Sequence, residues 1–141
     1  MTNLNFYLSQ MLTRGASDLF VSTFMPVSAK INGELTHLDN NKLSEEQALA
    51  LVESAMSEKQ KKEYHDTKEC NFAIATDEGR FRISAFWQRD KAGMVVRRIV
   101  SKIPDVSELG LPPILTDVIM AKRGLVLFVG GTGTGKSTSL A

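Results

Sequence analysis

The sequence is poor in the features that define several common protein classes. Its 141 residues include one cysteine, Cys70, and one tryptophan. A single cysteine excludes an internal disulfide and is too isolated to suggest a metal site. No apolar run approaches the ~20 residues that span a bilayer, and the first residues lack the basic and apolar regions of a signal peptide. We therefore expect a soluble cytoplasmic protein that does not insert into a membrane.

A strong charge of either sign is also missing. The chain has 17 Lys and Arg against 16 Asp and Glu, a net charge of +1. This balance gives no argument for a nucleic-acid partner. Hydrophobic residues make up 43% and charged residues 23%, which is typical of a packed globular chain. The length fits one domain, or one domain plus part of another.

The first hundred residues predict an α+β domain. Apolar residues recur at helical spacing over 3–14, and "NG" at Asn32-Gly33 predicts a tight hairpin. The sequences "SEEQ" and "SEKQ" have the capping-box pattern that begins helices. Period-two segments follow in "CNFAIAT", "GRFRISAFWQ" and "GMVVRRIV". We expect an antiparallel sheet with one face packed against the helices.

A second unit is expected after residue 102. The proline- and glycine-rich stretch "IPDVSELGLPP" at 103–113 predicts a linker, and a helix should run from Pro113 to Gly124. The unbroken apolar run Leu125–Val129 is typical of a strand buried on both faces of a parallel sheet. We therefore assign 1–102 to the first domain and 114–141 to the start of an α/β domain.

The strongest motif follows that run. "GGTGTGKS" fits G-x-x-x-x-G-K-[ST], in which glycines turn backbone N–H groups toward phosphate oxygens. Lys136 would reach the β- and γ-phosphates of ATP, Ser137 would ligate Mg²⁺, and Thr138 would lie near the α-phosphate or ribose. The alternative is a chance glycine-rich turn. The candidate ATP-binding residues here are Gly130, Gly131, Thr132, Gly133, Thr134, Gly135, Lys136, Ser137 and Thr138.

Two pairs of arginines form a weaker pattern. Arg80 and Arg82 share one face of a strand, whereas Arg97 and Arg98 on the next strand face opposite ways. A hairpin centred near Asp90 brings one of that pair close to Arg82. The arginines then belong either to a solvent-exposed face with local acids or to an anion site away from the glycine loop. The strand register decides between the two.

Other titratable residues form no catalytic or metal-binding pattern. His37 and His65 have no ligand-spaced partners, so each is interpreted as a surface histidine. Asp18, Glu69 and Asp77 are scattered acids without an evident catalytic geometry.

Several segments together resemble one family. "GASDLFVS", "KINGEL", "GRFRISAFWQR", "MVVRRI", "IPDVSELGLPPIL" and "RGLVLFVGGTGTGKSTSLA" resemble, in order and spacing, the N-terminal part of the PilT/PilU family of type IV pilus retraction ATPases. That family belongs to the secretion-ATPase superfamily. The resemblance covers about residues 15–141, so it is more specific than the glycine loop alone. "VGGTGTGKSTSL" and "ECNFAI" are closer to the PilU branch, the accessory retraction ATPases.

The resemblance implies a fold, an assembly and ligands. It implies a PAS-like domain joined to a RecA-like motor domain, in a hexameric ring at the cytoplasmic base of the pilus machine, peripheral to the inner membrane. ATP and Mg²⁺ would bind between the domains, with Arg82 and Arg97, and by a weaker match Arg80, contacting phosphates. The motor would power pilus retraction and twitching motility. Its partners would be a PilT-like ATPase and an inner-membrane platform protein.

Part of the family's machinery has no counterpart in this sequence. The acidic box, the Walker B glutamate and the histidine box lie beyond the glycine loop in the family, so no catalytic residue is assigned here. We expect the chain to be the N-terminal portion of a longer motor and to be inactive alone. The rival interpretations are a non-catalytic PAS-like interaction or sensory module and a type II secretion ATPase homologue.

Overall fold

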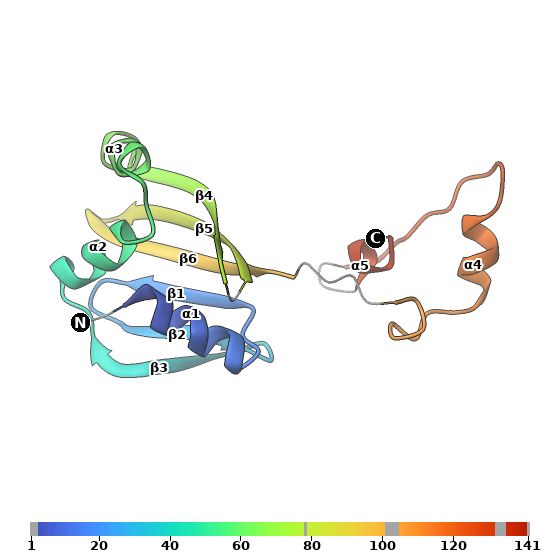
Figure 1. Ribbon diagram of the computed structural model, residues 1–141, viewed down its shortest axis with the longest axis horizontal. Helices are drawn as coiled ribbons and strands as arrows, with labels where there is room; N and C mark the ends of the chain where they lie inside the picture. Colours follow the sequence, from blue (N-terminus) through green and yellow to red (C-terminus); the bar gives the residue numbers. More distant parts are fainter. Residues whose placement is uncertain (1–2, 78, 101–104, 132–134, 141) are drawn as a thin grey trace. The chain divides into compact units, whose positions relative to one another are not determined.

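Six antiparallel strands form the framework of the first of two units of the chain, Met1–Ile99 (Figure 1). The second unit is Val100–Ala141, and each unit is described by itself. This computed structural model describes residues 3–77, 79–100, 105–131 and 135–140. Residues 103 and 104 of the predicted linker lie outside them, so the linker assignment stays a prediction.

The sheet has the strand order β3-β2-β1-β6-β5-β4. Its members are β1 (Asp18–Ser22), β2 (Pro26–Ile31), β3 (Glu34–Lys42), β4 (Glu69–Thr76), β5 (Gly79–Gln88) and β6 (Lys91–Ile99). The three period-two segments of the sequence are β4, β5 and β6. Two three-stranded meanders therefore meet where β1 pairs with β6, which joins residues more than seventy positions apart in the chain, such as Ser22 and Gly93.

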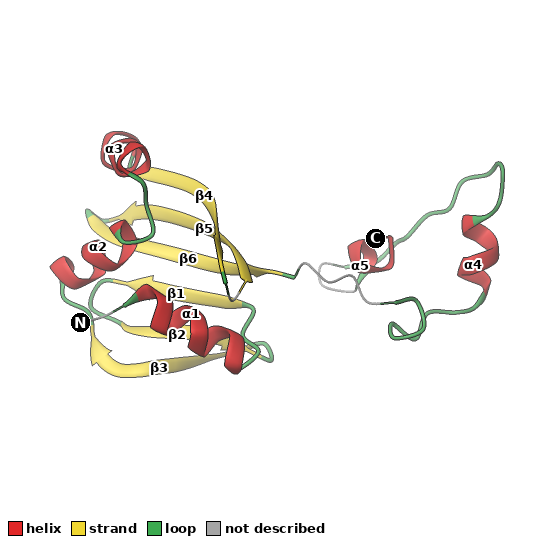
Figure 2. Ribbon diagram, viewed as in Figure 1, coloured by secondary structure: helices red, strands yellow, loops and turns green. Residues whose placement is uncertain are grey.

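Three helices cover one face of this sheet (Figure 2). They are α1 (Leu4–Thr13), α2 (Glu45–Glu53) and α3 (Glu58–Thr67). The predicted helix at 3–14 is confirmed, because Asn3 caps its first turn with a hydrogen bond of 3.0 Å from the Asn5 N–H. Both predicted capping boxes are present as well, with Ser44 and Ser57 as the N-cap residues.

The core lies between these helices and the sheet. Leu8 from α1, Leu51 from α2 and Tyr64 from α3 are buried against strand residues such as Phe81 and Ile83. Burial of large apolar side chains is the main favourable term in folding. The predicted α+β class, with helices on one face of an antiparallel sheet, is therefore confirmed.

The hairpins have the backbone that their turns require. Asn32 and Gly33 both have positive φ, 51° and 89°, which confirms the predicted turn between β2 and β3. The β5–β6 turn places Arg89 and Asp90 in the same left-handed region, with φ of 51° and 57°. These two residue types adopt that region less readily than glycine does.

The second unit contains two short helices, α4 (Ile114–Ile119) and α5 (Lys136–Leu140). The helix predicted to run to Gly124 therefore ends about one turn early. No residue of α4 is buried. Short helices are marginal unless an apolar face packs against something else, and in α4 only Leu115 and Val118 are even partly buried.

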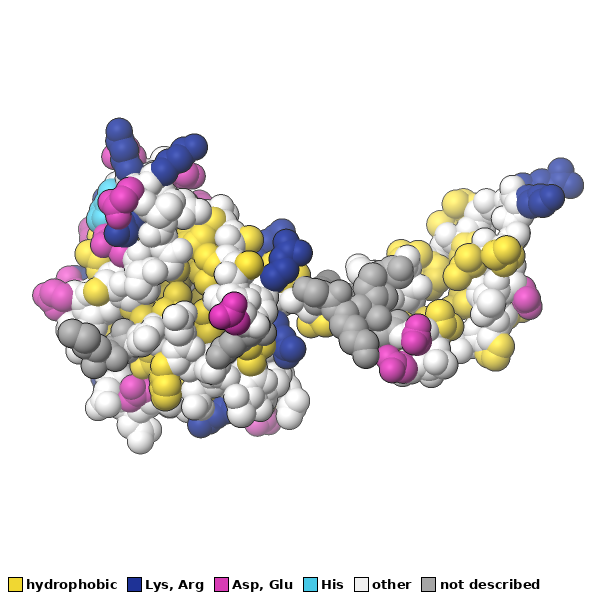
Figure 3. All heavy atoms as spheres, viewed as in Figure 1, with side chains coloured by type: hydrophobic (Ala, Val, Ile, Leu, Met, Phe, Trp, Pro, Cys, Tyr) yellow, Lys and Arg dark blue, Asp and Glu magenta, His cyan; other side chains and the backbone are white. Residues whose placement is uncertain are grey.

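The predicted strand Leu125–Val129 is not formed, which corrects the sequence interpretation. These residues have no strand assignment, and Leu125, Leu127 and Val129 are 83%, 73% and 90% exposed. A central parallel strand exists only with hydrogen-bonded neighbours, and the described residues supply none. Hydrophobic side chains are visible on the surface of this unit (Figure 3).

Candidate functional site

At the end of the glycine loop, the backbone has the positive-φ conformation that the motif predicts. Gly135 has a φ of 85°, a conformation that favours glycine. Helix α5 begins directly after it, and the Ser139 N–H and hydroxyl donate to the Gly135 carbonyl at 2.9 and 3.0 Å. Thr132, Gly133 and Thr134 lie outside the described residues. The backbone at Gly130, Gly131 and Gly135 is described, and so is the start of α5.

Lys136 is turned toward its own loop. Its ammonium group donates a hydrogen bond to the Gly131 carbonyl, so its charge lies beside the backbone that the motif assigns to phosphates. Ser137 and Thr138 follow on α5, and both are exposed to solvent. An ammonium group is a suitable hydrogen-bond donor to phosphate oxygens, and a hydroxyl oxygen is a suitable ligand for a magnesium ion. The residues present therefore fit ATP and Mg²⁺.

The first unit brings the strand arginines together. Arg82 of β5 lies directly opposite Arg97 of β6 in the ladder, which confirms the predicted proximity of the two strands' arginines. Arg80, two residues before Arg82 on β5, pairs with Ile99, and Arg98 pairs with Phe81 on the other face. Like charges directly opposite each other are unfavourable without an anionic partner.

The sequence analysis missed the acid that neutralises one of these arginines. Asp18 of β1 lies opposite Arg97 on its other side. The Arg97 Nε donates to Asp18 Oδ1 at 2.8 Å, and the Ser17 hydroxyl donates to Asp18 Oδ2 at 2.8 Å. The Asp18 side chain is 10% exposed and that of Arg97 is 69% exposed. Because Asp18 bonds Nε, the terminal nitrogens of Arg97 remain for another acceptor.

Burial and charge act in opposite directions on Asp18. Burial alone would raise the pKa of its carboxyl group. Hydrogen bonds from Arg97 and Ser17, with the charges of Arg97 and Lys30, outweigh that effect and hold the pKa of Asp18 below its usual value. Asp18 is therefore ionised at neutral pH and orients Arg97.

The arginines differ in whether they have an acidic partner. Arg97 has a local acid, as the solvent-exposed interpretation requires. For Arg80 and Arg82, no ion-pair partner exists among the residues that the structure describes. The cationic pair Arg82 and Arg97 thus carries one compensating carboxylate, which leaves a net positive charge at this end of the sheet.

The histidines lie at the surface, as the sequence analysis interpreted them. His37 Nδ1 is 2.8 Å from the hydroxyl of the buried Ser28, and His65 Nε2 is 2.6 Å from Glu53 Oε1. Within the described residues, no three His, Cys, Asp or Glu side chains are grouped so that they could hold a metal ion. Among the same residues, no helix combines the length and the hydropathy of a membrane span.

The chain thus combines an α+β domain that carries paired strand arginines with a phosphate-loop motif that follows it in the sequence. A family model described as type II/IV secretion system protein matches residues 1–141. The chain belongs to this family.

Relatives within the family carry pilus functions. The chain is 50% identical over 135 residues to the type IV pilus ATPase PilU of Pseudomonas aeruginosa, covering 95% of this chain and 35% of that protein. It is 38% identical over 129 residues to the type IV pilus retraction ATPase PilT of the same organism, covering 91% and 38%. A crystal structure of the pilus retraction motor PilT with bound ADP matches with a TM-score of 0.83 and 30% identity, covering 99% and 41%. The chain thus spans little more than a third of the length of these relatives.

Proposed function

We propose that this chain is the N-terminal portion of an ATP-hydrolysing motor that powers type IV pilus retraction and twitching motility. One observation carries the proposal: 50% identity to a type IV pilus ATPase extends over 95% of the chain. The complete phosphate-loop motif in the sequence is consistent with it. A chance glycine-rich turn would not explain similarity over the whole α+β domain.

Each candidate residue has a role in this proposal. The loop from Gly130 to Gly135 surrounds the phosphates of ATP, Lys136 supplies the positive charge, and Thr138 lies beside the nucleotide. Ser137 holds Mg²⁺, which neutralises phosphate charge when it is bound. The proposal also assigns phosphate contacts to arginines of the first unit.

The arginines differ in how well their side chains are oriented to contact a phosphate. Arg97 is held at Nε by Asp18, with its terminal nitrogens available. Arg82 lies opposite it in the ladder, so an anion contacting both would relieve their repulsion. Arg80, two residues before Arg82 on the same face of β5, contributes charge rather than an oriented contact.

The proposed assembly is the one that the resemblance to the family implies. The motor is a hexamer in the cytoplasm, at the inner-membrane base of the pilus. It works with a PilT-like ATPase and with a platform protein of the inner membrane. No acid in this chain is assigned to activate water, so we expect the chain to bind ATP weakly and to hydrolyse it at background rate.

The test is equilibrium binding of Mg·ATP to this chain, compared with its Lys136→Ala variant. Loss of the ammonium group should weaken binding about tenfold or more. Lys122→Ala removes an exposed lysine of the same unit outside the motif and should leave the affinity unchanged. Equal affinity of the Lys136→Ala variant and the parent chain would contradict the assignment of the loop. Robust hydrolysis by this chain would contradict the expected inactivity.

A further inference from the structure

A cavity lies at the end of the first unit's sheet, where the β1–β2 turn meets the β5–β6 hairpin. Its volume is about 310 Å³. Ser22 and Gly93 pair at this end of β1 and β6, whereas Asp18 and Arg97 pair at the other end. We call it the hairpin-end pocket. Its lining residues are Ser22, Thr23, Phe24, Phe86, Gln88, Arg89, Lys91, Ala92 and Gly93.

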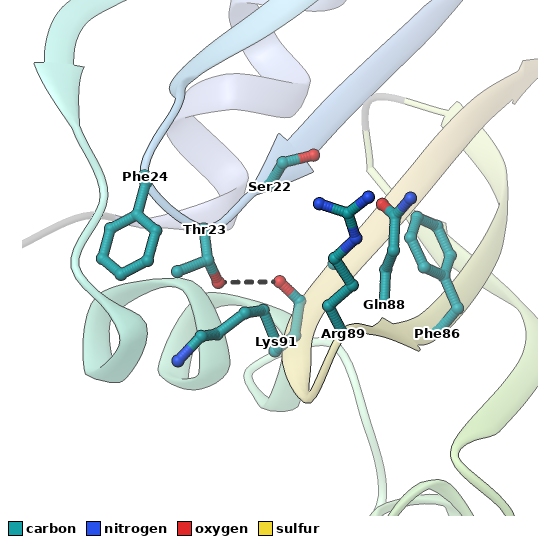
Figure 4. Close-up of a pocket in the computed structure, with 9 residues that line it drawn as sticks. Ser22, Thr23, Phe24, Phe86, Gln88, Arg89 and Lys91 are labelled. Carbon is teal, nitrogen blue, oxygen red and sulfur yellow. Dashed lines mark hydrogen bonds between the residues drawn. The ribbon is translucent and has the colours of Figure 1, made fainter.

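The lining is cationic. It includes Arg89 and Lys91 but no carboxylate. Lys91 is paired with Glu45, and its ammonium group lies 5.7 Å from the centre of the Phe24 ring. Arg89 has no ion-pair or hydrogen-bond partner within the described part of the chain. Figure 4 shows its guanidinium group extending in the same direction as the Gln88 amide. The available charge therefore favours an anionic ligand.

The backbone around the pocket is held in an unusual conformation. Phe24 and Arg89 have φ of 65° and 51°, where glycine or asparagine would be less strained. The Phe24 N–H donates to the Leu43 carbonyl at 2.9 Å, and the Thr23 hydroxyl donates to the Ala92 carbonyl at 3.0 Å. The first bond ties the β1–β2 turn to the residue after β3, and the second, drawn in Figure 4, ties it to the start of β6. Two strained residues thus present their side chains to one preformed cavity.

An aromatic wall lies beside the cationic group. The Phe86 ring rests directly on the β6 backbone at Gly93, where a Cβ atom would come within 3.0 Å of Phe86 Cε2. Glycine at this position therefore allows the ring to lie close against the strand. The Phe24 ring, 55% exposed, contributes a second aromatic surface. A guanidinium group with two phenyl rings suits a carboxylate that is attached to an apolar group.

We propose that the hairpin-end pocket binds an acidic peptide segment of a partner protein, with a carboxylate side chain on Arg89 and an adjacent apolar side chain against Phe24 and Phe86. Charge complementarity is the main argument for this occupant. The walls at Ser22, Phe24, Gln88 and Arg89 are exposed, so the site is accessible to a side chain presented by another protein. A peptide also supplies the apolar group that inorganic phosphate lacks. The proposal does not depend on nucleotide binding by the second unit.

The experiment uses two synthetic peptides, acetyl-Gly-Phe-Glu-Gly-amide and acetyl-Gly-Phe-Gln-Gly-amide. Each is titrated into the ¹⁵N-labelled chain while backbone amide signals are followed by NMR. The glutamate peptide should shift the Ser22, Arg89 and Gly93 amides saturably, with a dissociation constant on the order of millimolar. The glutamine peptide should bind about tenfold more weakly or not at all.

The Arg89→Asn variant distinguishes the role of the Arg89 side chain in binding from its role in folding. Asparagine adopts positive φ more readily than arginine, so the variant should fold, and glutamate-peptide binding should weaken about tenfold. Arg123→Asn makes the same change at an exposed arginine of the second unit and should bind normally. Equal binding of the two peptides, shifts at other residues, or unchanged binding by Arg89→Asn would overturn the proposal. Equally strong binding of inorganic phosphate would indicate a general anion site and would overturn the peptide assignment.

Discussion

The two units of the chain differ in where their apolar residues find partners. In Met1–Ile99, all six strands have hydrogen-bonded neighbours and the helices cover one face of the sheet. In Val100–Ala141, the most apolar segment, Leu125–Val129, has no strand partner among the described residues and is largely exposed. Alternating strands that follow one another in the chain pair through hairpins. A continuous apolar strand needs neighbours on both sides and coverage of both faces.

The largest expected effect separates the two units directly. Phe81 is fully buried in the core of the first unit, so Phe81→Ala should lower the free energy of unfolding by about 3–5 kcal/mol. Phe128→Ala makes the same chemical change in the second unit, where it should cost less than about 1 kcal/mol. Urea denaturation followed by circular dichroism measures both. Equal costs would contradict the difference in packing between the units.

A smaller effect tests the close packing at Gly93. A Cβ at this position would lie 3.0 Å from Phe86 Cε2 and 3.3 Å from the Val21 carbonyl oxygen. We therefore expect Gly93→Ala to cost about 1–3 kcal/mol by overpacking. Gly79→Ala is the matched control, because its Cβ would meet the Phe81 ring at an ordinary 3.8 Å. If the two variants are equally stable, the ring does not require a glycine beneath it.

The Asp18–Arg97 pair extends the comparison to the uncovered face of the first unit. Asp18→Asn removes a charge-assisted hydrogen bond at a mostly buried carboxylate. Since Arg97 is largely exposed, we expect the free energy of unfolding to fall by only about 1–2 kcal/mol. Asp66→Asn, at an exposed residue of α3, should change stability by less than about 0.5 kcal/mol. A cost for Asp18→Asn no larger than that of the control would show that the pair contributes nothing to stability.

The same pair predicts a pH dependence. The pKa of Asp18 is lowered in the folded chain, so its contribution is fully present above the usual pKa of an aspartate and is lost as pH falls through the folded-state pKa. The stability difference between the parent chain and Asp18→Asn should be constant from about pH 7 to pH 5 and should shrink toward about pH 3. A difference that grows on acidification would contradict the direction of the pKa shift.

Local signals in the sequence predicted much of the first unit. Capping boxes, the Asn32-Gly33 turn and the period-two segments each depend on a few neighbouring residues. The short β5–β6 connection, together with side-chain alternation, was sufficient to predict an arginine of β6 close to Arg82. The partner of Arg97 was missed, because Asp18 reaches it only through the pairing of β1 with β6. No local pattern reports a pairing across that sequence separation.

In the second unit, local sequence signals predicted less of the structure. The motif predicted a glycine at the left-handed position before α5, and Gly135 has that conformation. The predicted strand Leu125–Val129 and the longer helix from Pro113 both depended on packing partners. Their composition indicates that burial of these segments would be favourable, but it does not identify the surface against which they would be buried. The hairpin-end pocket was also unforeseen, because its strained turns carry Phe24 and Arg89 rather than glycine.

The central claim, that this chain belongs to a pilus retraction motor working through its glycine loop, is tested most directly in the cell. The measurement is the twitching zone of the source organism after Lys136→Ala is introduced into the gene, with surface pili quantified in parallel. The account predicts that twitching is lost while pili remain on the surface. The matched Lys122→Ala strain should twitch normally. Normal twitching of the Lys136→Ala strain would contradict the claim.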